Sequence, residues 1–579
     1  MNTAYNTTGI LAVDPVMSEC VEYGKLRYSY ASLTSFSIMT SVGPWDHIIV
    51  GGGLAGCVVA HRLKQYQPSS RILVLEAGPD VSGNKDILHF NSLNFIGGQF
   101  DWGNKTVPQT HLNGRQIHVP AGKALGGGSV INGCGWFRGS KADFDNWAEA
   151  VQDERWSYQG QLKYIKMTEK WYNNENAESH GHDGKLQIES PTSTGRIYPL
   201  SAITEQSWTE VGLSKLPGND MNAGTNLGFG ELNENRSQGA RQIAPLVYPL
   251  DGITVKTDIL VRAIKLVGSQ AVGVHLDNGD EILGKEVIIA AGAYRTPQIL
   301  MLSGIGPKET LDKYGIEVRV ENPGVGNNYN DHVMMHLNWK LKDPSKGYAL
   351  GSSNPLLAEP QFTMGTPLSH VACTAIPRDR LEAAIAKDEG HLNTDHDLLK
   401  RNWAVMENLV MYIAVPPLKI DGTHISNALM GMKPTSRGTV TIESKDPKVA
   451  PLLDPNYFAT EVDKAVWRHS LRNITALMTG DTALGRDVVA AETPLPGFEP
   501  LTIDAGDEYL DNRVKAQGIS TFHGCGTCSM GKVVDTDLRV KGVQNLRIVD
   551  ASVIPISIGA HIQAAVYALA EQAAISTLA

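Results

Sequence analysis

Hydrophobic and polar positions follow two different periods along this chain. Near the N-terminus, short apolar runs at 47–50 and 72–75 flank a stretch whose apolar residues recur with helical spacing. Residues 438–442 instead alternate between polar and apolar positions, which predicts a strand of an antiparallel sheet. Residues 562–578 contain no proline or glycine and predict a helix. The pattern predicts an α/β fold, α+β overall, with a βαβ unit first and an antiparallel sheet with helices later.

The turn between the first strand and the first helix carries the motif Gly51-x-Gly53-x-x-Gly56. The first glycine permits a sharp turn, the second lets the backbone approach a pyrophosphate, and the third lets helix and strand pack closely. The helix N-terminus then faces the anion. Glu76 ends the second strand, where a carboxylate binds a ribose diol and repels a 2′-phosphate. The set predicts a Rossmann-like site for FAD or NAD and disfavours NADP.

A second glycine-rich segment, 122–133, reads GKALGGGSVING. Its consecutive glycines and Ser129 offer backbone N–H groups with no side chain in the way, as a closely approaching planar or anionic ligand requires. Alone, the segment could be a flexible loop. Together with the first motif it supports a single cofactor site.

Two histidines near the C-terminus lie in segments rich in glycine and small residues. His523 is part of TFHGCGTCSMG at 521–531, and His561 is part of SIGAHIQ at 557–563. An imidazole, with an unperturbed pKa of about 6.5, is suited to removing a hydroxyl proton near neutral pH. We therefore take both as candidate catalytic residues, although the segments alone do not specify the reaction.

The cysteine pair Cys525-x-x-Cys528 beside His523 could also bind zinc or form a redox dithiol. No second pair of ligands appears at similar spacing. We interpret these cysteines as packing residues and expect no metal.

Composition narrows the possible partners. The chain has 579 residues, of which 42% are hydrophobic and 19% charged, so a large core with two or more lobes is expected. A net charge of -10 argues against a nucleic-acid partner and favours a small-molecule substrate. No apolar run approaches the roughly 18–20 residues that span a bilayer, and no secretory signal is evident. With only six cysteines, the chain is expected to be intracellular.

Taken in order, the motifs resemble those of the glucose–methanol–choline (GMC) oxidoreductase family of FAD enzymes. The resemblance runs from about residue 46 to the C-terminus and includes GAYRTPQILMLSGIG at 292–306 and the Asp331-His332 pair. Histidine at both C-terminal positions is similar to the family's His/His subgroup. For His332 the resemblance implies a structural role.

The resemblance implies FAD in an extended pose. Adenosine would lie near Glu76 and Val261, pyrophosphate over 51–56, and the flavin against 128–133 and the C-terminal segments. The expected cofactor contacts are Gly51, Gly53, Leu54, Ala55, Gly56, Glu76, Ala77, Gly122, Gly127, Gly128, Ser129, Asn132, Gly133, Val261, Asp550, Ala551 and Gln563.

It also implies two lobes after an N-terminal extension, 1–44. The FAD-binding domain would be discontinuous, and so would the substrate-binding domain. The expected ranges are 45–155, 227–335 and 519–579 for the first, and 156–226 and 336–518 for the second.

By family position, His523 would remove the hydroxyl proton of an alcohol as hydride passes to the flavin, with His561 hydrogen-bonding the same oxygen. Dioxygen or a quinone-like acceptor would reoxidise the flavin. The same fold also includes hydroxynitrile lyases, a fungal polyketide cyclase and a light-driven fatty-acid decarboxylase. A non-redox or atypical use of FAD in a biosynthetic pathway is therefore the alternative.

Some family members link FAD covalently through a histidine just before the loop asparagine. This chain has Ile131 there, so we expect non-covalent FAD. Trp102 could contact the flavin or simply pack, and Phe522 occupies a position where other members carry an aromatic that shapes oxygen access. A homodimer is one candidate assembly.

Overall fold

The first sheet grows from the N-terminal apolar runs. The computed structural model describes residues 44–89 and 96–577, so the expected extension 1–44 lies outside it except for its last residue. β1 (Trp45–Val50) pairs in parallel with β2 (Ile72–Leu75) and with β11 (Glu281–Ile289). Further strands join at both sides: β8 (Thr254–Lys256) and β23 (Leu546–Ile548) in parallel, and β10 (Gln270–Leu276) and β9 (Val261–Val267) antiparallel.

Helices cover this sheet. α1 (Leu54–Tyr66) follows the glycine turn directly and buries Val58, Val59 and Leu63 completely. α15 (Gln563–Ser576) packs against α1 and against α5 (Tyr158–Thr168), which explains why nearly all its side chains are buried. The helix predicted over 562–578 is therefore present, and it begins two residues after His561.

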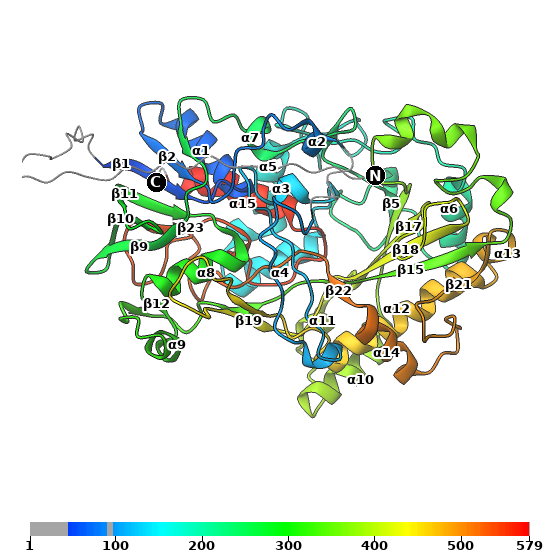
Figure 1. Cartoon of the computed structure of the whole chain (residues 1–579). Coiled ribbons are helices and arrows are strands. Elements are labelled where there is room, and N and C mark those ends of the chain that lie inside the picture. The colour runs from blue at the N-terminus through cyan, green and yellow to red at the C-terminus, as the bar shows by residue number, and fades with distance from the viewer. Residues whose placement is uncertain (1–43, 90–95, 578–579) are drawn as a thin grey trace, which may run out of the picture. The chain divides into compact units, whose positions relative to one another are not determined.

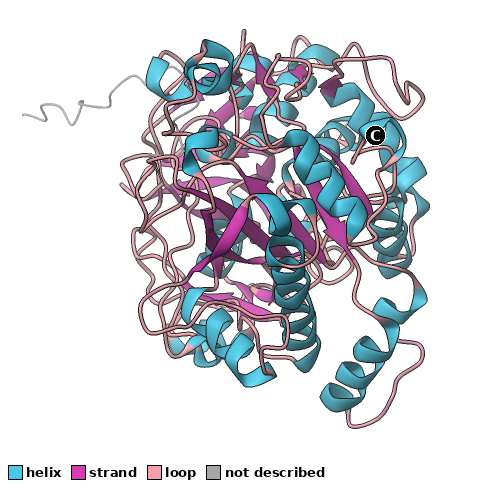
Figure 2. Ribbon diagram, turned by 90° about the vertical axis from the view of Figure 1, so that its right-hand side faces the viewer, coloured by secondary structure: helices cyan, strands magenta, loops and turns pink. Residues whose placement is uncertain are grey.

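The second large sheet is antiparallel. Its order is β21-β15-β18-β17-β16-β5, and β22 pairs with the start of β15. In Figure 1 its strands lie to the right of the first sheet, and α12 (Glu461–Thr479) packs on β18 and β21. Figure 2 shows strands crossing the centre of the described chain with helices at the periphery. The strands are β21 (Val489–Thr493), β15 (Val333–Leu341), β18 (His424–Gly431), β17 (Met406–Met411), β16 (His370–Thr374), β5 (Gly228–Glu231) and β22 (Ile519–Ser520).

The predicted fold class is confirmed, with one difference in detail. The strand predicted at 438–442 is present as β19 (Gly438–Thr441), but it belongs to a separate three-stranded sheet with β14 (Asn327–Tyr329) and β20 (Leu452–Asp454). Strand pairing also places β5 and β22 in the antiparallel sheet, although the expected ranges count them with the FAD-binding domain. The division into domains stays a prediction.

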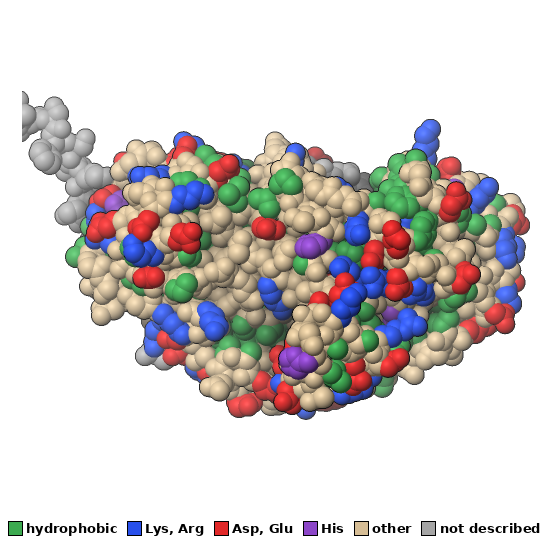
Figure 3. Space-filling model, turned by 90° about the horizontal axis from the view of Figure 1, so that it is seen from below, with side chains coloured by type: hydrophobic (Ala, Val, Ile, Leu, Met, Phe, Trp, Pro, Cys, Tyr) green, Lys and Arg blue, Asp and Glu red, His purple; other side chains and the backbone are tan. Residues whose placement is uncertain are grey.

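Two features of the described chain concern the expectations about membranes and nucleic acids. Within the described residues, no helix is both long and apolar enough to cross a membrane. On the face drawn in Figure 3, acidic and basic side chains are interspersed rather than gathered by sign.

Candidate active site

The turn after β1 has room only for glycine at two positions. Gly51 has a φ of +103°, and a Cβ there would overlap the carbonyl oxygen of Ala290. A Cβ on Gly56 would overlap the carbonyl of Gly51, so α1 starts directly against the end of β1. Gly53 lies against Gly127, whose own Cβ would meet the Gly53 Cα at 2.7 Å. The two glycine-rich segments therefore meet at one site.

Glu76 is buried at the end of β2. Its two carboxyl oxygens accept hydrogen bonds from the N–H groups of Gly52 and Gly78, both at 2.8 Å. Burial raises the pKa of this carboxyl to about 7, and the backbone donors oppose that rise. Because a carboxylate oxygen accepts more than one hydrogen bond, Glu76 keeps the capacity to bind a ribose diol.

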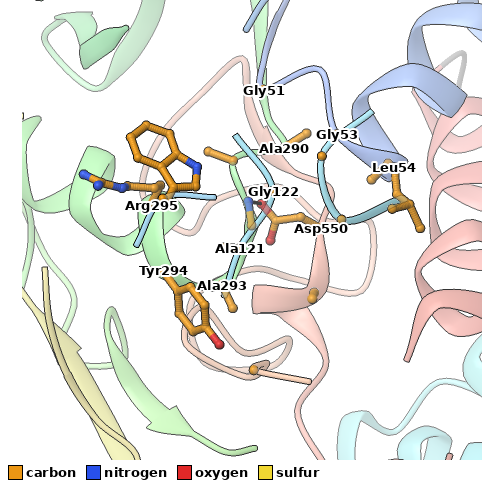
Figure 4. A pocket seen from close by; sticks show the side chains of 18 of the residues that line it. Gly51, Gly53, Leu54, Ala121, Gly122, Ala290, Ala293, Tyr294, Arg295 and Asp550 are labelled. Atoms are coloured by element: carbon orange, nitrogen blue, oxygen red, sulfur yellow. Dashed lines mark hydrogen bonds between the residues drawn. The ribbon is translucent and has the colours of Figure 1, made fainter. Parts of the chain in front are cut away.

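A cavity of about 320 Å³ connects these features with the C-terminal histidines. Figure 4 shows Gly53 and Leu54 on one side of it, Arg295 on the other, and Asp550 between them. The lining includes most of the expected cofactor residues, namely Gly51, Gly53, Leu54, Ala55, Glu76, Ala77, Gly122, Gly127, Gly128, Asn132, Gly133, Val261, Asp550, Ala551 and Gln563.

Gly56 and Ser129 do not line the cavity. The hydroxyl of Ser129 donates to the carbonyl of Gly126 at 2.6 Å and accepts from the Ala244 N–H at 2.9 Å. Its side chain therefore holds the shape of the glycine-rich loop, while Gly56 acts through packing.

His523 and His561 meet at one end of the cavity. Their ring centroids are 5.1 Å apart, and both residues line the cavity wall. Burial lowers the pKa of His523 well below its ordinary value, and the nearby His561 and His332 lower it further. An imidazole in this setting is neutral near pH 7 and is available as a proton acceptor.

A third histidine, His332, lies behind this pair. Its Nδ1 is 3.0 Å from Nδ1 of His523, and its Nε2 is 3.0 Å from the hydroxyl of Ser557. Burial, followed by the positive charge of Lys433, lowers the pKa of His332 to about 3. The sequence placed His332 in a structural role and gave no sign that its ring contacts His523.

His561 is held by a carboxylate that sequence reasoning missed. Its Nε2–H donates to Oε1 of Glu407 at 2.9 Å, and Glu407 is 1% exposed. Gly135 leaves room for the ring, because a Cβ there would meet His561 Nδ1 at 2.6 Å. Glu407 lies on β17 in the part of the chain that least resembles the family, so no motif pointed to it.

The backbone around His523 is fixed by a buried carboxylate. One oxygen of Asp331 accepts from the His523 N–H at 2.8 Å, and the other accepts from the hydroxyls of Tyr457 and Ser520, both at 2.5 Å. Burial raises the pKa of Asp331 to about 6, which leaves it ionised near neutrality. Phe522 has a φ of +68°, a strained value for a bulky residue, and this network holds it there.

A buried amide also faces the cavity without a protein partner. Asn104 is 1% exposed and lines the cavity, yet neither polar atom of its side chain has a hydrogen-bond partner in the structure. A buried amide in this state costs free energy unless a ligand satisfies it. Trp102 lines the cavity nearby in sequence, and the Arg295 guanidinium lies 4.0 Å from the centre of its ring.

Comparisons with known proteins identify the family. The chain matches two models described as GMC oxidoreductase, over residues 45–334 and 434–570. The GMC-type oxidoreductase acuG of Aspergillus aculeatus is 39% identical over 544 residues, covering 92% of this chain and 99% of that protein. The oxygen-dependent choline dehydrogenase of Escherichia coli (strain K12) is 32% identical over 559 residues, covering 92% of this chain and 95% of that protein. The chain belongs to the GMC oxidoreductase family.

A solved structure agrees with this assignment. An FAD-dependent oxidoreductase from Chaetomium thermophilum shares 25% identity, with a TM-score of 0.80, over 92% of this chain and 99% of that one. The residues present fit FAD, because one cavity runs from the buried Glu76 through the two glycine segments to the histidines, and the unsatisfied amide of Asn104 lies in its wall. This GMC oxidoreductase is thus an FAD flavoprotein.

The remaining motif interpretations can be placed within the GMC fold. Ile131 lines the cavity, at the position where some family members carry a linking histidine. Cys525 and Cys528 are buried free thiols, and burial raises the pKa of Cys525 to about 12. Within 44–89 and 96–577, no group of three or more His, Cys, Asp or Glu side chains could hold a metal ion.

Proposed function

We propose that this GMC oxidoreductase oxidises an alcohol, with His523 as the base that takes the hydroxyl proton. The observation that carries the proposal is the pair of imidazoles at one end of the cofactor cavity, where His523 is half-buried and desolvation lowers its pKa well below the ordinary value. An alcohol is too weak an acid to lose its proton unaided near neutral pH, so a neutral imidazole in contact with it lowers the barrier.

The chain's own residues divide the work between them. His523 accepts the hydroxyl proton, and Glu407 orients the ring of His561 beside it. The carbinol carbon loses hydride, so the substrate becomes a carbonyl compound as the C–H and O–H bonds break. When bound, FAD supplies the acceptor for that hydride, and dioxygen or a quinone-like acceptor takes up the electrons. The relative named as a choline dehydrogenase supports an alcohol as the substrate class.

FAD is proposed to be dissociable. Ile131 has no atom that could form the bond that a linking histidine makes, and it packs in an apolar cluster with Val130, Phe100 and Ile243. Binding then rests on the glycine turns, Glu76 and the cavity wall rather than on a covalent link.

Anaerobic mixing tests the reaction. Purified holoenzyme is mixed without oxygen with a panel of primary, benzylic and polyol alcohols and choline, and the flavin absorbance is followed. We expect at least one alcohol to bleach the flavin, and peroxide on aeration would mark an oxidase. Conversion of a compound while the flavin stays oxidised would refute hydride transfer and favour the non-redox alternative.

A further inference from the structure

A chain of hydrogen bonds runs from His523 into the protein interior. Nδ1 of His523 lies 3.0 Å from Nδ1 of His332, and Nε2 of His332 lies 3.0 Å from Oγ of Ser557. Oγ of Ser557 in turn lies 3.1 Å from the carbonyl oxygen of Met432. His332 is 2% exposed and Ser557 is 5% exposed, so water does not compete for these groups.

The last acceptor in this series of hydrogen bonds, the Met432 carbonyl, determines which group donates in each of the others. A carbonyl oxygen only accepts, so the single hydroxyl proton of Ser557 is donated to Met432. Ser557 must then accept from His332, which places the His332 proton on Nε2.

The direction of the hydrogen bond between His523 and His332 follows from the neutral charge of both rings. Burial lowers the pKa of His332 to about 3 and that of His523 well below its ordinary value, so each ring carries one proton near pH 7. With its proton on Nε2, His332 has a lone pair at Nδ1 and accepts from Nδ1–H of His523. The other nitrogen of His523, Nε2, is left without a proton.

We infer that His332 and Ser557 are positioning residues that hold His523 in the tautomer whose Nε2 lone pair is free to take the substrate proton. The inference rests on the proposed function for its purpose, because the tautomer matters only if His523 is the base. It is independent of that function in its geometry.

An acceptor of this kind has a chemical consequence. In a serine protease triad, a carboxylate both fixes the tautomer and stabilises the imidazolium that forms. A neutral His332 fixes the tautomer but offers less stabilisation to the imidazolium, because it carries no negative charge. His523 therefore stays a weak, neutral base that gives its proton up readily after each turnover.

Residues 557–559 connect to both histidines of the pair, because Ser557 hydrogen-bonds His332 behind His523 and the segment leads directly into His561. The carbonyl oxygen of Ser557 accepts from Lys433 at 2.6 Å, and Lys433 pairs with the buried Asp143, which also accepts from the Gly559 N–H at 2.8 Å. Residues 557–559 are thus anchored at several points just before His561. A displaced Ser557 would disturb His332 and also the backbone segment that positions His561.

The tautomer can be measured without turnover. Holoenzyme labelled with 15N only at histidine gives separate NMR signals for protonated and unprotonated ring nitrogens, and the His523→Gln variant identifies the His523 pair by its loss. We expect protonated Nδ1 and unprotonated Nε2 in His523. The opposite assignment overturns the inference, whether or not any alcohol is oxidised.

Kinetics provide a second test. His332→Leu removes the acceptor and should slow flavin reduction roughly 10- to 100-fold, with FAD content unchanged. His332→Asn places an amide oxygen near the former Nδ1 and should recover most of that loss. His370→Leu, at another buried histidine, on β16, should leave the rate unchanged.

The outcomes separate the two proposals. A His332→Leu rate equal to wild type, or a His332→Asn rate as low as that of His332→Leu, overturns the inference. Should His332→Leu fail to fold, Ser557→Ala takes its place, with a mixed His523 tautomer and a slower flavin reduction expected. If no alcohol bleaches wild-type flavin, the proposed reaction fails while the NMR assignment still decides the tautomer.

Discussion

At the scale of single residues, burial and the hydrogen bonds that offset its cost determine which groups are charged. His332 and Asp331 lie in the interior and His523 lies half-buried at the cavity wall, and desolvation lowers the pKa of both imidazoles and raises that of the carboxyl. The imidazoles are therefore neutral, while Asp331 stays ionised because hydroxyl and N–H donors surround it. His523 is therefore suited to accept a proton, whereas Asp331 only fixes the backbone of the loop that carries it.

Replacing the base is the simplest residue-scale prediction. His523→Ala removes the proton acceptor, so flavin reduction by a substrate alcohol should slow roughly 10²- to 10⁴-fold. Stopped-flow absorbance under anaerobic conditions measures the rate, with His370→Ala, at a buried histidine on β16, as the control. An unchanged rate in His523→Ala would show that another group takes the proton.

The buried neutral state of His332 predicts an effect of pH on stability. Its pKa is about 3 in the folded protein, against about 6.5 when unfolded. Between these values the unfolded chain binds more protons, so this residue lowers the free energy of unfolding as pH falls below about 6.5, by about 1.4 kcal/mol per pH unit.

His332→Asn lacks that dependence. Urea unfolding of wild type and His332→Asn at pH 7.5 and pH 5.5 should therefore show a stability difference that shifts in favour of the variant at the lower pH. Contributions from titrating groups that do not contact His332 largely cancel in this comparison. A difference that is the same at both pH values would mean that His332 is not buried as a neutral ring.

At the scale of elements, the site is built where strands end and helices begin. Gly51 directly follows β1, Glu76 directly follows β2, and α15 starts two residues after His561. Ligands of open parallel sheets bind at such carboxyl ends because the connections leave a crevice there. The antiparallel sheet contributes from its own strands, with Glu407 on β17 and His332 just before β15.

The contact between the two glycine segments predicts that FAD binding is sensitive to a methyl group added at Gly127. Gly127 has a φ of +52°, and a Cβ on it would meet the Gly53 Cα at 2.7 Å. Gly127→Ala should therefore move the two segments apart and lower the FAD content of the purified protein, read from the ratio of flavin to protein absorbance. Gly83→Ala is the matched control, because its Cβ meets nothing within 4 Å. Equal FAD content in both variants would argue against this contact as part of the cofactor site.

At the scale of the whole molecule, local patterns were predictable and long-range contacts were not. The βαβ unit, Glu76 and the His523/His561 pair follow from short segments whose geometry is set by nearby residues. Glu407 reaches His561 across 154 positions, and His332 reaches His523 across 191 through the pairing of β22 with the start of β15, so only long-range contacts bring these groups together. Alternation correctly predicted an antiparallel strand at 438–442, but it could not identify β14 and β20 as the partner strands.

The cofactor itself supplies the prediction that belongs to the whole chain. The cavity expected to hold FAD is lined by segments from Gly51 to Gln563, which only the folded chain brings together, so added FAD should raise the unfolding temperature by an amount that grows with its concentration over Kd. With Ile131 in place of a linking histidine, acid precipitation should leave all the flavin in the supernatant. An Ile131→Val variant, which keeps an apolar residue there, should behave the same way. Flavin that stays with the washed pellet would show a covalent bond through another residue and would exclude dissociable FAD.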